Sequence, residues 1–351
     1  MGTNPPTERA GRGGAEDRER VAVALGGNTV LSAGGPWTAA AQRAAVAETA
    51  GDVATLLDDD REVLLTHGNC PQVGNLLEQQ EQTPETPQVG LDVLVAETQA
   101  RVGYLLQQAL ARALADRRDG HRSGGERDVA TLVTRTIVDG DDPAFDDPTK
   151  PVGPYYTPAE AAARSFETRE VRQGGDGGGA DDGDAAAGDD GADAEATHRR
   201  VVPSPDPRAV VETAEVDRLL AAGDLVVAAG GGGVPVVRED GGLSGVEAVV
   251  DKDLATQRLA TALGVERLVL LTDVEYAYVD YGEPTQTPLR AVDPDALREH
   301  LTAGEFEPGT MRPKVEACCR FVESSGDLAA ITTPAHLADA LAGASGTRVT
   351  E

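Results

Sequence analysis

Lysine is the scarcest charged residue in this 351-residue chain. Only Lys150, Lys252 and Lys314 occur among its 31 basic residues, and the other positive charges are arginines. Acidic residues number 60, so the formal net charge is −29. Such an excess of negative charge repels nucleic acids and anionic membrane surfaces, and a general polyanion-binding role is disfavoured. The composition is typical of a salt-adapted surface that is rich in hydrated carboxylates.

Cysteine and long apolar runs are also scarce. Three cysteines, of which Cys318 and Cys319 are adjacent, provide neither a disulfide framework nor a C-x-x-C metal-ligand spacing. We expect the adjacent pair to be small buried residues of a helix. No apolar run reaches the ~18–20 residues of a membrane-spanning helix, and residues 1–20 lack the apolar stretch of a signal peptide. These features predict a cytoplasmic protein whose own side chains hold no metal.

The rest of the sequence alternates apolar strands with helices. Strands are predicted at 21–25, 63–66, 130–138, 225–229, 246–250, 268–271 and 328–331. Helices are predicted at about 37–57, 91–115, 209–222, 252–263, 295–302, 311–323 and from Pro334 onward. Continuously apolar strands separated by helices are typical of a mostly parallel sheet covered on both faces. We therefore predict an α/β fold, a three-layer αβα open sandwich, with ligands beyond the carboxyl ends of the strands.

Two segments differ from this pattern. Residues 1–20 mix glycine, proline and charges without an apolar period, which predicts a disordered N-terminal arm. Residues 174–195 consist of 8 Gly, 6 Ala and 8 acidic residues. Nothing in that stretch can bury a side chain larger than that of alanine, so we expect a flexible acidic insertion.

Several predicted strands end in glycine. Gly26 and Gly27 follow the first strand, Gly68 follows the second, and Gly230–Gly233 follow another. Glycine lets the backbone approach a ligand and aim consecutive N–H groups at phosphate oxygens. Glycine is also the default residue of an ordinary tight turn, so both interpretations remain open.

Familiar nucleotide-binding motifs are absent. A Walker A loop needs Gly-Lys, and no lysine in this chain follows a glycine. The dinucleotide fingerprint fails because Pro235 stands where its third glycine belongs. The H-R-D and D-F-G signatures of protein kinases do not occur either. Any phosphate chemistry here must use another α/β arrangement.

Two of the lysines are predicted near the glycine-rich turns. Lys252 begins a helix directly after a predicted strand, and Lys314 lies near the start of another helix, after Pro313. A lysine ammonium is a compact point charge, and phosphoryl transfer needs mainly positioning and charge neutralisation. A neighbouring carboxylate such as Asp253 could hold the ammonium groups in place. The alternative is that both lysines face solvent and that Asp251 only caps a helix.

Ordered motifs over about residues 20–335 make the sequence similar to the carbamate kinases of the amino-acid-kinase superfamily. The motifs are Val23-Ala-Leu-Gly-Gly-Asn28, Thr66-His-Gly-Asn69, Pro148-Thr-Lys150, Pro203-Ser-Pro205, Gly245–Leu254, Leu271-Thr-Asp-Val274 and Pro313-Lys-Val-Glu-Ala317. The Pro-Ser-Pro, Pro-Thr-Lys and His-Gly-Asn segments distinguish carbamate kinases from the rest of the superfamily.

The resemblance implies an open αβα sandwich, a homodimer and a reversible reaction in which ATP and carbamate give ADP and carbamoyl phosphate. Mg²⁺ would arrive with the nucleotide, and the partners would be these small molecules, with no nucleic acid and no membrane. Such enzymes commonly run towards ATP at the end of arginine fermentation. The implied organisation is a single domain over residues 21–351, with a protruding lobe at about 139–172 beside the acidic insertion.

Matching positions imply the members of the site. Lys252 and Lys314 would neutralise the transferred phosphoryl group, Asp253 would organise them, and Lys150 would reach the site from the lobe. The implied positions for the phosphoryl group and carbamate are Gly26, Gly27, Asn28, Asn69, Gly231 and Gly232. The implied positions on the nucleotide side are Asp273 and Tyr278.

Two positions depart from the family pattern, because Cys70 and Arg312 stand where the family has glycine. If those glycines have a positive φ, a side chain would cost roughly 1 kcal/mol or more and move the loop. Two alternatives therefore stay open. One is an enzyme of the same superfamily with another acceptor, and the other is a non-catalytic sensor of nucleotide or carbamoyl phosphate. For His67 we expect a structural role in its loop.

Overall fold

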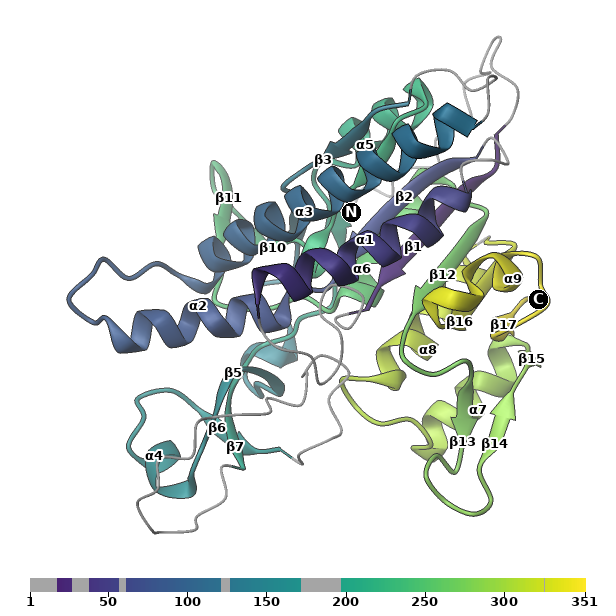
Figure 1. Cartoon of the computed structure of the whole chain (residues 1–351). Helices are drawn as coiled ribbons and strands as arrows, with labels where there is room; N and C mark the ends of the chain where they lie inside the picture. Colours follow the sequence, from purple (N-terminus) through teal and green to yellow (C-terminus); the bar gives the residue numbers. More distant parts are fainter. Residues whose placement is uncertain (1–17, 27–37, 57–60, 121–126, 172–196, 325) are drawn as a thin grey trace.

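The computed structural model describes residues 18–26, 38–56, 61–120, 127–171, 197–324 and 326–351. Its centre is an eight-stranded sheet (Figure 1). The strands are β1 (Arg20–Leu25), β2 (Glu62–His67), β3 (Val129–Thr131), β9 (Leu225–Val227), β12 (Arg267–Leu271), β15 (Ala291–Val292), β16 (Leu328–Thr332) and β17 (Thr347–Val349). Their order is β15-β17-β16-β12-β1-β2-β9-β3, and every pair is parallel except β16 with β17.

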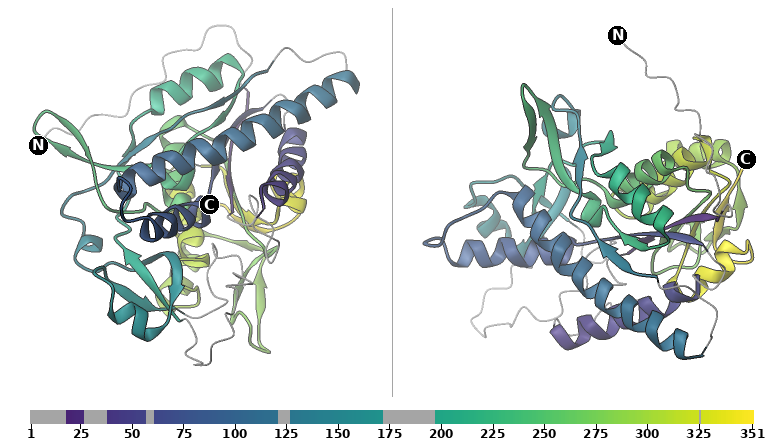
Figure 2. Two further views of the ribbon diagram at one scale, coloured as in Figure 1. Left: turned by 60° about the vertical axis from the view of Figure 1, so that its left-hand side comes forward. Right: turned by 90° about the horizontal axis from the view of Figure 1, so that it is seen from above.

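Helices cover both faces of this sheet (Figure 2). The helices are α1 (Ala39–Thr55), α2 (Cys70–Gln82), α3 (Leu91–Gly120), α4 (Pro158–Ala162), α5 (Thr213–Ala222), α6 (Lys252–Leu263), α7 (Pro294–Ala303), α8 (Met311–Glu323) and α9 (Leu337–Leu341). α1, α3 and α9 pack on one face, and α5 to α8 pack on the other. The predicted αβα sandwich is confirmed. In the described part of the chain, no helix combines the length and apolar character needed to cross a membrane.

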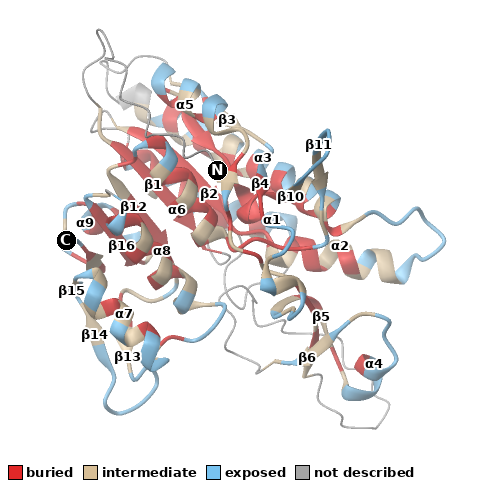
Figure 3. Cartoon of the chain, turned by 180° about the vertical axis from the view of Figure 1, so that it is seen from behind, coloured by how far each residue is buried: buried red, intermediate tan, exposed pale blue. Residues whose placement is uncertain are grey.

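The alternation of side chains along β1 divides the core in two. Ala22 and Ala24 pack in the cluster that contains α6 and α8, whereas Val21, Val23 and Leu25 pack in the cluster that contains α1 and α3. All residues of β1 and of β2 are buried (Figure 3). A strand buried on both faces needs a continuous apolar run, which is why the sequence predicted these two strands correctly.

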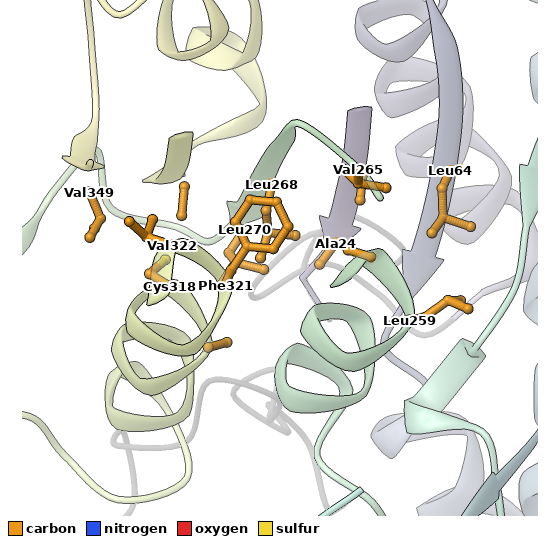
Figure 4. Close-up of a cluster of buried hydrophobic side chains, with 14 of the residues drawn as sticks. Ala24, Leu64, Leu259, Val265, Leu268, Leu270, Cys318, Phe321, Val322 and Val349 are labelled. Carbon is orange, nitrogen blue, oxygen red and sulfur yellow. The ribbon is translucent and has the colours of Figure 1, made fainter. Parts of the chain in front are cut away.

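The core between the sheet and α8 contains two of the cysteines, of which Figure 4 labels Cys318. Cys318 and Cys319 pack with Phe321 and Val322 of the same helix and are fully buried. Burial raises the pKa of both thiols, that of Cys319 to about 12. Both therefore act as small apolar core residues, as predicted.

Three smaller sheets surround the central one. The first contains β4 (Arg135–Ile137), β8 (Ala209–Val210), β10 (Val234–Glu239) and β11 (Gly242–Gly245), and the second is the hairpin of β13 (Ala277–Val279) and β14 (Thr287–Leu289). The third contains β5 (Lys150–Tyr156), β6 (Thr168–Glu170) and β7 (His198–Val202), and together with α4 we call it the lobe. The lobe and the β13–β14 hairpin project at the same end of the molecule (Figure 1).

The predicted domain division stays a prediction. β7 belongs to the lobe sheet although it follows the predicted lobe range of 139–172. The insertion at 174–195 and residues 1–17 of the predicted arm lie outside the described residues.

The predicted strand over 130–138 is wrong, because this segment forms two strands in different sheets. β3 pairs with β9 in the central sheet, and β4 pairs with β10 and β8. Between them the Thr134 N–H donates to Gln99 Oε1 (3.0 Å), and the Ala229 N–H donates to Thr134 Oγ1 (2.9 Å). These side-chain bonds satisfy the backbone where the chain passes from one sheet to the other.

Two further predictions are wrong in part. Residues 246–250 form no strand, and the Val249 N–H donates to Pro203 O (3.0 Å) instead of joining a ladder. The predicted helix over 209–222 starts only at Thr213, because Ala209 and Val210 form β8 and pair with β4. An apolar run indicates burial, but it does not distinguish a strand from a buried connection.

Candidate active site

The carboxyl ends of the central strands meet at one edge of the sheet. β1 leads into Gly26, β2 leads into Asn69, β9 leads into residues 228–233, and β12 leads into Asp273. Helices α6 and α8 also begin near this edge, because their first turns share a cavity with Asn69. The edge is therefore the predicted ligand-binding side of the sheet.

The glycines after β9 form one tight turn in close contact with its neighbours. Gly231 and Gly232 have φ values of 61° and 87°. A Cβ on Gly231 would lie 2.1 Å from Asn69 Oδ1, and a Cβ on Gly232 would lie 2.3 Å from Val250 O. Both positions therefore need glycine for conformation as well as for space.

Asp251 starts helix α6 and also holds the lobe. Its Oδ1 accepts hydrogen bonds from the N–H groups of Asp253 (2.9 Å) and Leu254 (3.3 Å), which makes it the N-cap before Lys252. Its Oδ2 accepts from Lys150 Nζ (3.1 Å) at the start of β5. A role for Asp251 as a cap alone is therefore wrong.

Asp253 lies between the other two lysines. Its Oδ1 accepts from Lys252 Nζ (2.5 Å), and its Oδ2 accepts from Lys314 Nζ (3.1 Å). Lys314, in the first turn of α8, also donates to Thr310 O (3.3 Å). Asp253 is 2% exposed and Lys314 is 6% exposed, so the solvent-facing alternative is wrong for Lys314.

The pKa values in this cluster follow from burial and charge together. Burial by itself raises the pKa of Asp253, but the Lys252 and Lys314 ammonium groups outweigh it and hold that pKa well below its usual range. Burial lowers the pKa of Lys252; the Asp253 carboxylate opposes this shift, and the Lys314 ammonium adds to it. Burial also acts to lower the pKa of Lys150, yet Asp251 and its other neighbours raise it overall. The cluster keeps Asp253 ionised.

A small cavity of about 40 Å³ lies against these groups. Its lining includes Lys150, Lys252, Lys314, Asp251, Asp253, Asn69 and Gly231. Its volume suits a group of a few non-hydrogen atoms. A larger cleft of about 670 Å³ between the lobe and α8 shares Cys70, Lys150, Asp251 and Gly309 with it. The small cavity therefore adjoins a space large enough for a bigger substrate.

The cleft differs in charge from the rest of the chain. Its basic lining residues are Lys150, Arg169, Arg199, Arg312 and Arg320. Its acidic lining residues are Glu170, Asp251, Glu307 and Glu316. Bases are thus slightly in excess here, although the chain as a whole has 31 bases and 60 acids. Such a local excess of positive charge attracts anionic ligands.

Cys70 and Arg312, for which the resemblance implied glycine in the family, both line the cleft. Cys70 is the first residue of α2, and Arg312 is the second residue of α8. Neither has a positive φ, so the backbone strain considered for them is absent. Arg312 is exposed, and it forms no ion pair with any residue that the structure describes. Its guanidinium adds one more positive charge to the cleft.

His67 ends β2 in a closed environment. Its Nδ1 lies 2.9 Å from Gly68 O, and a Cβ on Gly230 would lie 2.4 Å from its Nε2. Burial lowers the pKa of the imidazole to about 4, so the ring is neutral near pH 7. The enclosed, uncharged ring agrees with the predicted structural role.

The predicted nucleotide residues are not part of this cluster. Asp273 is exposed and accepts a hydrogen bond from Thr272 Oγ1 (3.1 Å). Tyr278 belongs to β13, and its ring centroid lies 6.3 Å from that of Tyr276 and 5.8 Å from that of Tyr281. Neither Asp273 nor Tyr278 lines the small cavity or the cleft. Their role towards a nucleotide stays a prediction.

The predicted phosphoryl-binding glycines differ in whether they lie at the small cavity. Gly231 lines the small cavity, and Gly232 lies against Val250, which lines it as well. Gly26 is buried at the end of β1 and lines neither space. Gly27 and Asn28 lie outside the described residues.

Sequence reasoning missed two members of the site. The ion pair of Asp251 with Lys150 was not predicted, since Asp251 was considered only as a helix cap. Thr98 of α3, whose Oγ1 accepts from Asn69 Nδ2 (2.8 Å), was not considered at all. The position of Asp251 directly before a predicted helix was a usable signal, whereas nothing local distinguishes Thr98.

Sequence comparison places these features in a family. The pattern that defines the amino acid kinase family matches residues 19–333. The carbamate kinase of Halobacterium salinarum is 43% identical over 327 residues, which cover 93% of this chain and 97% of the relative. The carbamate kinase of Thermococcus kodakarensis is 42% identical over 337 residues, which cover 94% of this chain and 99% of the relative.

Comparison with solved structures points to the same family. Carbamate kinase from Giardia lamblia bound to AMP-PNP matches with a TM-score of 0.81 and 34% identity, covering 95% of this chain and 99% of that chain. The chain is therefore a member of the amino acid kinase family. Within that family it belongs to the carbamate kinases, as the resemblance predicted.

Proposed function

We propose that this chain is a carbamate kinase, which transfers a phosphoryl group reversibly between ATP and carbamate and forms carbamoyl phosphate. The observation that carries the proposal is the convergence of Lys150, Lys252 and Lys314 on one cavity, held there by Asp251 and Asp253. These are all the lysines of the chain. Relatives that match it over nearly their whole length are carbamate kinases.

The lysines neutralise the charge of the reaction. Towards ATP, an oxygen of the ADP β-phosphate attacks the phosphorus of carbamoyl phosphate, and the P–O bond to carbamate breaks with its electron pair leaving on carbamate. Negative charge spreads over the transferred group during this step, and Lys252 and Lys314 stabilise it. Both oxygens of Asp253 are occupied by ammonium groups, so Asp253 positions the lysines and accepts no proton.

The remaining assignments rest on position at the strand ends and on the matching motifs. Lys150 places a third cation beside the carbamate end. Backbone N–H groups of Gly26, Gly27, Gly231 and Gly232, together with Asn28, hold phosphoryl oxygens. Asp273 and Tyr278 contact the nucleotide.

Magnesium enters as part of the nucleotide substrate. The described residues include no group of three or more His, Cys, Asp or Glu side chains that could hold a metal ion. Both oxygens of Asp253 are already bound to lysines. Mg²⁺ in such sites is bound largely through substrate phosphates and water. MgATP and MgADP are therefore the nucleotide species of this proposal.

The proposal extends to assembly and context. We also propose that the chain forms a homodimer and lies in the cytoplasm beside the ADP pool. Its flux would run towards ATP in arginine fermentation. Light scattering should give twice the 36.3 kDa mass of one chain. A monomer at micromolar concentration would contradict the dimer alone and leave the activity untouched.

The test of the activity is direct. Purified protein, MgADP and carbamoyl phosphate in molar KCl should form ATP, and the absence of ATP above background would remove the proposal. Lys314→Met should lower turnover roughly 10²-fold or more, since it removes one cation from the transferred group. Arg218→Met, which changes an exposed residue of α5, is the matched control and should leave turnover unchanged. Retained activity in Lys314→Met would refute the role of that lysine.

The same preparation separates the two alternatives. Phosphorylation of acetylglutamate or uridylate by ATP, without any reaction of carbamoyl phosphate, would indicate another acceptor. Tight ADP binding by calorimetry without turnover would indicate a sensor.

A further inference from the structure

Thr98 fixes the orientation of the Asn69 amide. Asn69 Nδ2 lies 2.8 Å from Thr98 Oγ1, and both residues are at most 1% exposed. The Thr98 hydroxyl itself donates to Leu94 O (2.8 Å), with Val95 O also in reach (3.0 Å). Because the single hydroxyl proton is used on the backbone of α3, Thr98 can only accept from Asn69. The amide must therefore turn its NH₂ group towards Thr98.

This orientation leaves Asn69 Oδ1 as an acceptor without a donor. The oxygen is buried and has no hydrogen-bond partner among the described residues. The amide as a whole lies against Gly231, where a Cβ would be 2.1 Å from Oδ1 and 2.2 Å from Nδ2, and both Asn69 and Gly231 line the small cavity. A buried acceptor without a partner is costly, so a donor from a ligand would satisfy it.

The other polar side chains of the cavity are donors or are already engaged. Lys150, Lys252 and Lys314 offer only N–H groups. Both oxygens of Asp251 and both of Asp253 accept from these lysines or from the start of α6. Apart from the thiol of Cys70, which is only a weak acceptor, Asn69 Oδ1 is thus the one free side-chain acceptor among the described residues that line the cavity.

We propose that Asn69, oriented by Thr98, selects an acceptor anion that carries an N–H group beside its carboxylate. This inference rests on the proposed function, since carbamate is such an anion. Its oxygens face the ammonium groups, and its amino group donates to Asn69 Oδ1. Acetate has a methyl group at the same place and would leave Oδ1 unpaired, which a buried polar site penalises strongly. Asn69 is a specificity residue, and Thr98 is a positioning residue that acts through it.

The test compares two acyl phosphates that differ in this one group. We would measure kcat/KM for ATP formation from MgADP with carbamoyl phosphate and with acetyl phosphate, and take their ratio. The wild-type ratio should be high. Thr98→Val, which removes the acceptor that orients the amide, should lower the ratio about tenfold or more, and Asn69→Leu should do the same. Thr98→Ser keeps the hydroxyl and should restore the wild-type ratio.

A difference in intrinsic reactivity between the two acyl phosphates cancels when variants are compared with wild type. A purely structural role of Thr98 would lower both rates together and leave the ratio unchanged, which would overturn the proposal. If Thr98→Val does not fold, as judged by circular dichroism, an unchanged ratio in Asn69→Leu overturns it equally. Wild-type protein that forms no ATP from carbamoyl phosphate would instead refute the proposed function, and this inference with it.

Discussion

At the scale of single residues, the charge on Lys252 depends on its neighbours. Burial lowers the pKa of this lysine, and the ammonium of Lys314 lowers it further. The carboxylate of Asp253, 2.5 Å from Lys252 Nζ, acts in the opposite direction. Asp253 therefore maintains the charge that the proposed phosphoryl transfer needs.

Asp253→Asn should consequently move the alkaline limit of activity to lower pH. A lysine is charged below its pKa, so a further fall in the pKa of Lys252 removes its charge at a lower pH than in wild type. We expect turnover near pH 7 to fall about tenfold or more, with the alkaline limb displaced downward. A profile of kcat between about pH 6 and pH 10 measures both effects. An alkaline limb that stays in place would show that Asp253 does not sustain this charge.

His67 makes folding sensitive to mild acid. Its pKa is about 4 in the folded protein and 6.5 for an ordinary histidine, so between these values the unfolded chain binds a proton that the folded chain does not. The contribution of His67 to the free energy of unfolding is therefore at its full value above about pH 6.5. It decreases as the pH falls and is lower by about 2 kcal/mol at pH 5. Urea unfolding of wild type and His67→Gln at pH 7 and pH 5 measures this. Between pH 7 and pH 5, the unfolding free energy of His67→Gln should fall less than that of wild type. An equal fall in both proteins would contradict a neutral buried His67.

At the scale of elements, Asp251 joins a helix start to the lobe, and two substitutions separate these roles. Asn is also a good N-cap, so Asp251→Asn should keep the cap of α6 and lose only the charge that binds Lys150. Asp251→Ala should lose both and be less stable than Asp251→Asn by roughly 1 kcal/mol. Both variants should lose turnover. Chemical denaturation measures the difference in stability, and equal unfolding free energies would show that the side chain contributes no cap.

Elements that depend on local signals were predictable from the sequence. β1, β2 and β12 follow from continuous apolar runs, and the start of α6 follows from the capping Asp251. The break between β3 and β4 was not predictable, because it depends on Gln99 of α3, 35 residues before Thr134. Helix α2 and the β10–β11 hairpin were not predicted either.

The candidate site likewise has residues that local sequence signals indicate and contacts that only the folded chain reveals. The lysines were found because they are so few and because their surrounding motifs are recognisable. The pairing of Lys150 with Asp251 joins residues 101 positions apart, so only the folded chain reveals it. Asn69 lines the small cavity together with the lysines, but the orientation of its amide depends on Thr98 in a separate helix.

At the scale of the whole molecule, net charge sets the response to salt. With a formal charge of −29, the compact state is opposed by repulsion among its carboxylates. Raising the ionic strength from about 0.1 M to 1 M shortens the screening length from about 10 Å to about 3 Å. Most of that repulsion should then disappear.

We therefore expect the unfolding temperature to rise by several degrees between about 0.1 M and 1 M KCl. Scanning calorimetry measures the shift, and NaCl at equal ionic strength is the control for ion-specific effects. The neutral additive sorbitol at the same osmolarity should not reproduce the full rise. A melting temperature that falls as KCl increases would contradict the salt-adapted interpretation of the surface.

The shared carboxylates of Asp251 and Asp253 also constrain how this protein can evolve. Asp251 binds Lys150, Asp253 binds both Lys252 and Lys314, and each aspartate has both of its oxygens engaged. Replacing either aspartate leaves at least one ammonium group without its carboxylate in a nearly dry place, so we expect such single replacements to be disfavoured. Descendants of this chain should inherit the five positions as one block. Arg312, which has no ion-pair partner among the described residues, can vary from lineage to lineage by itself.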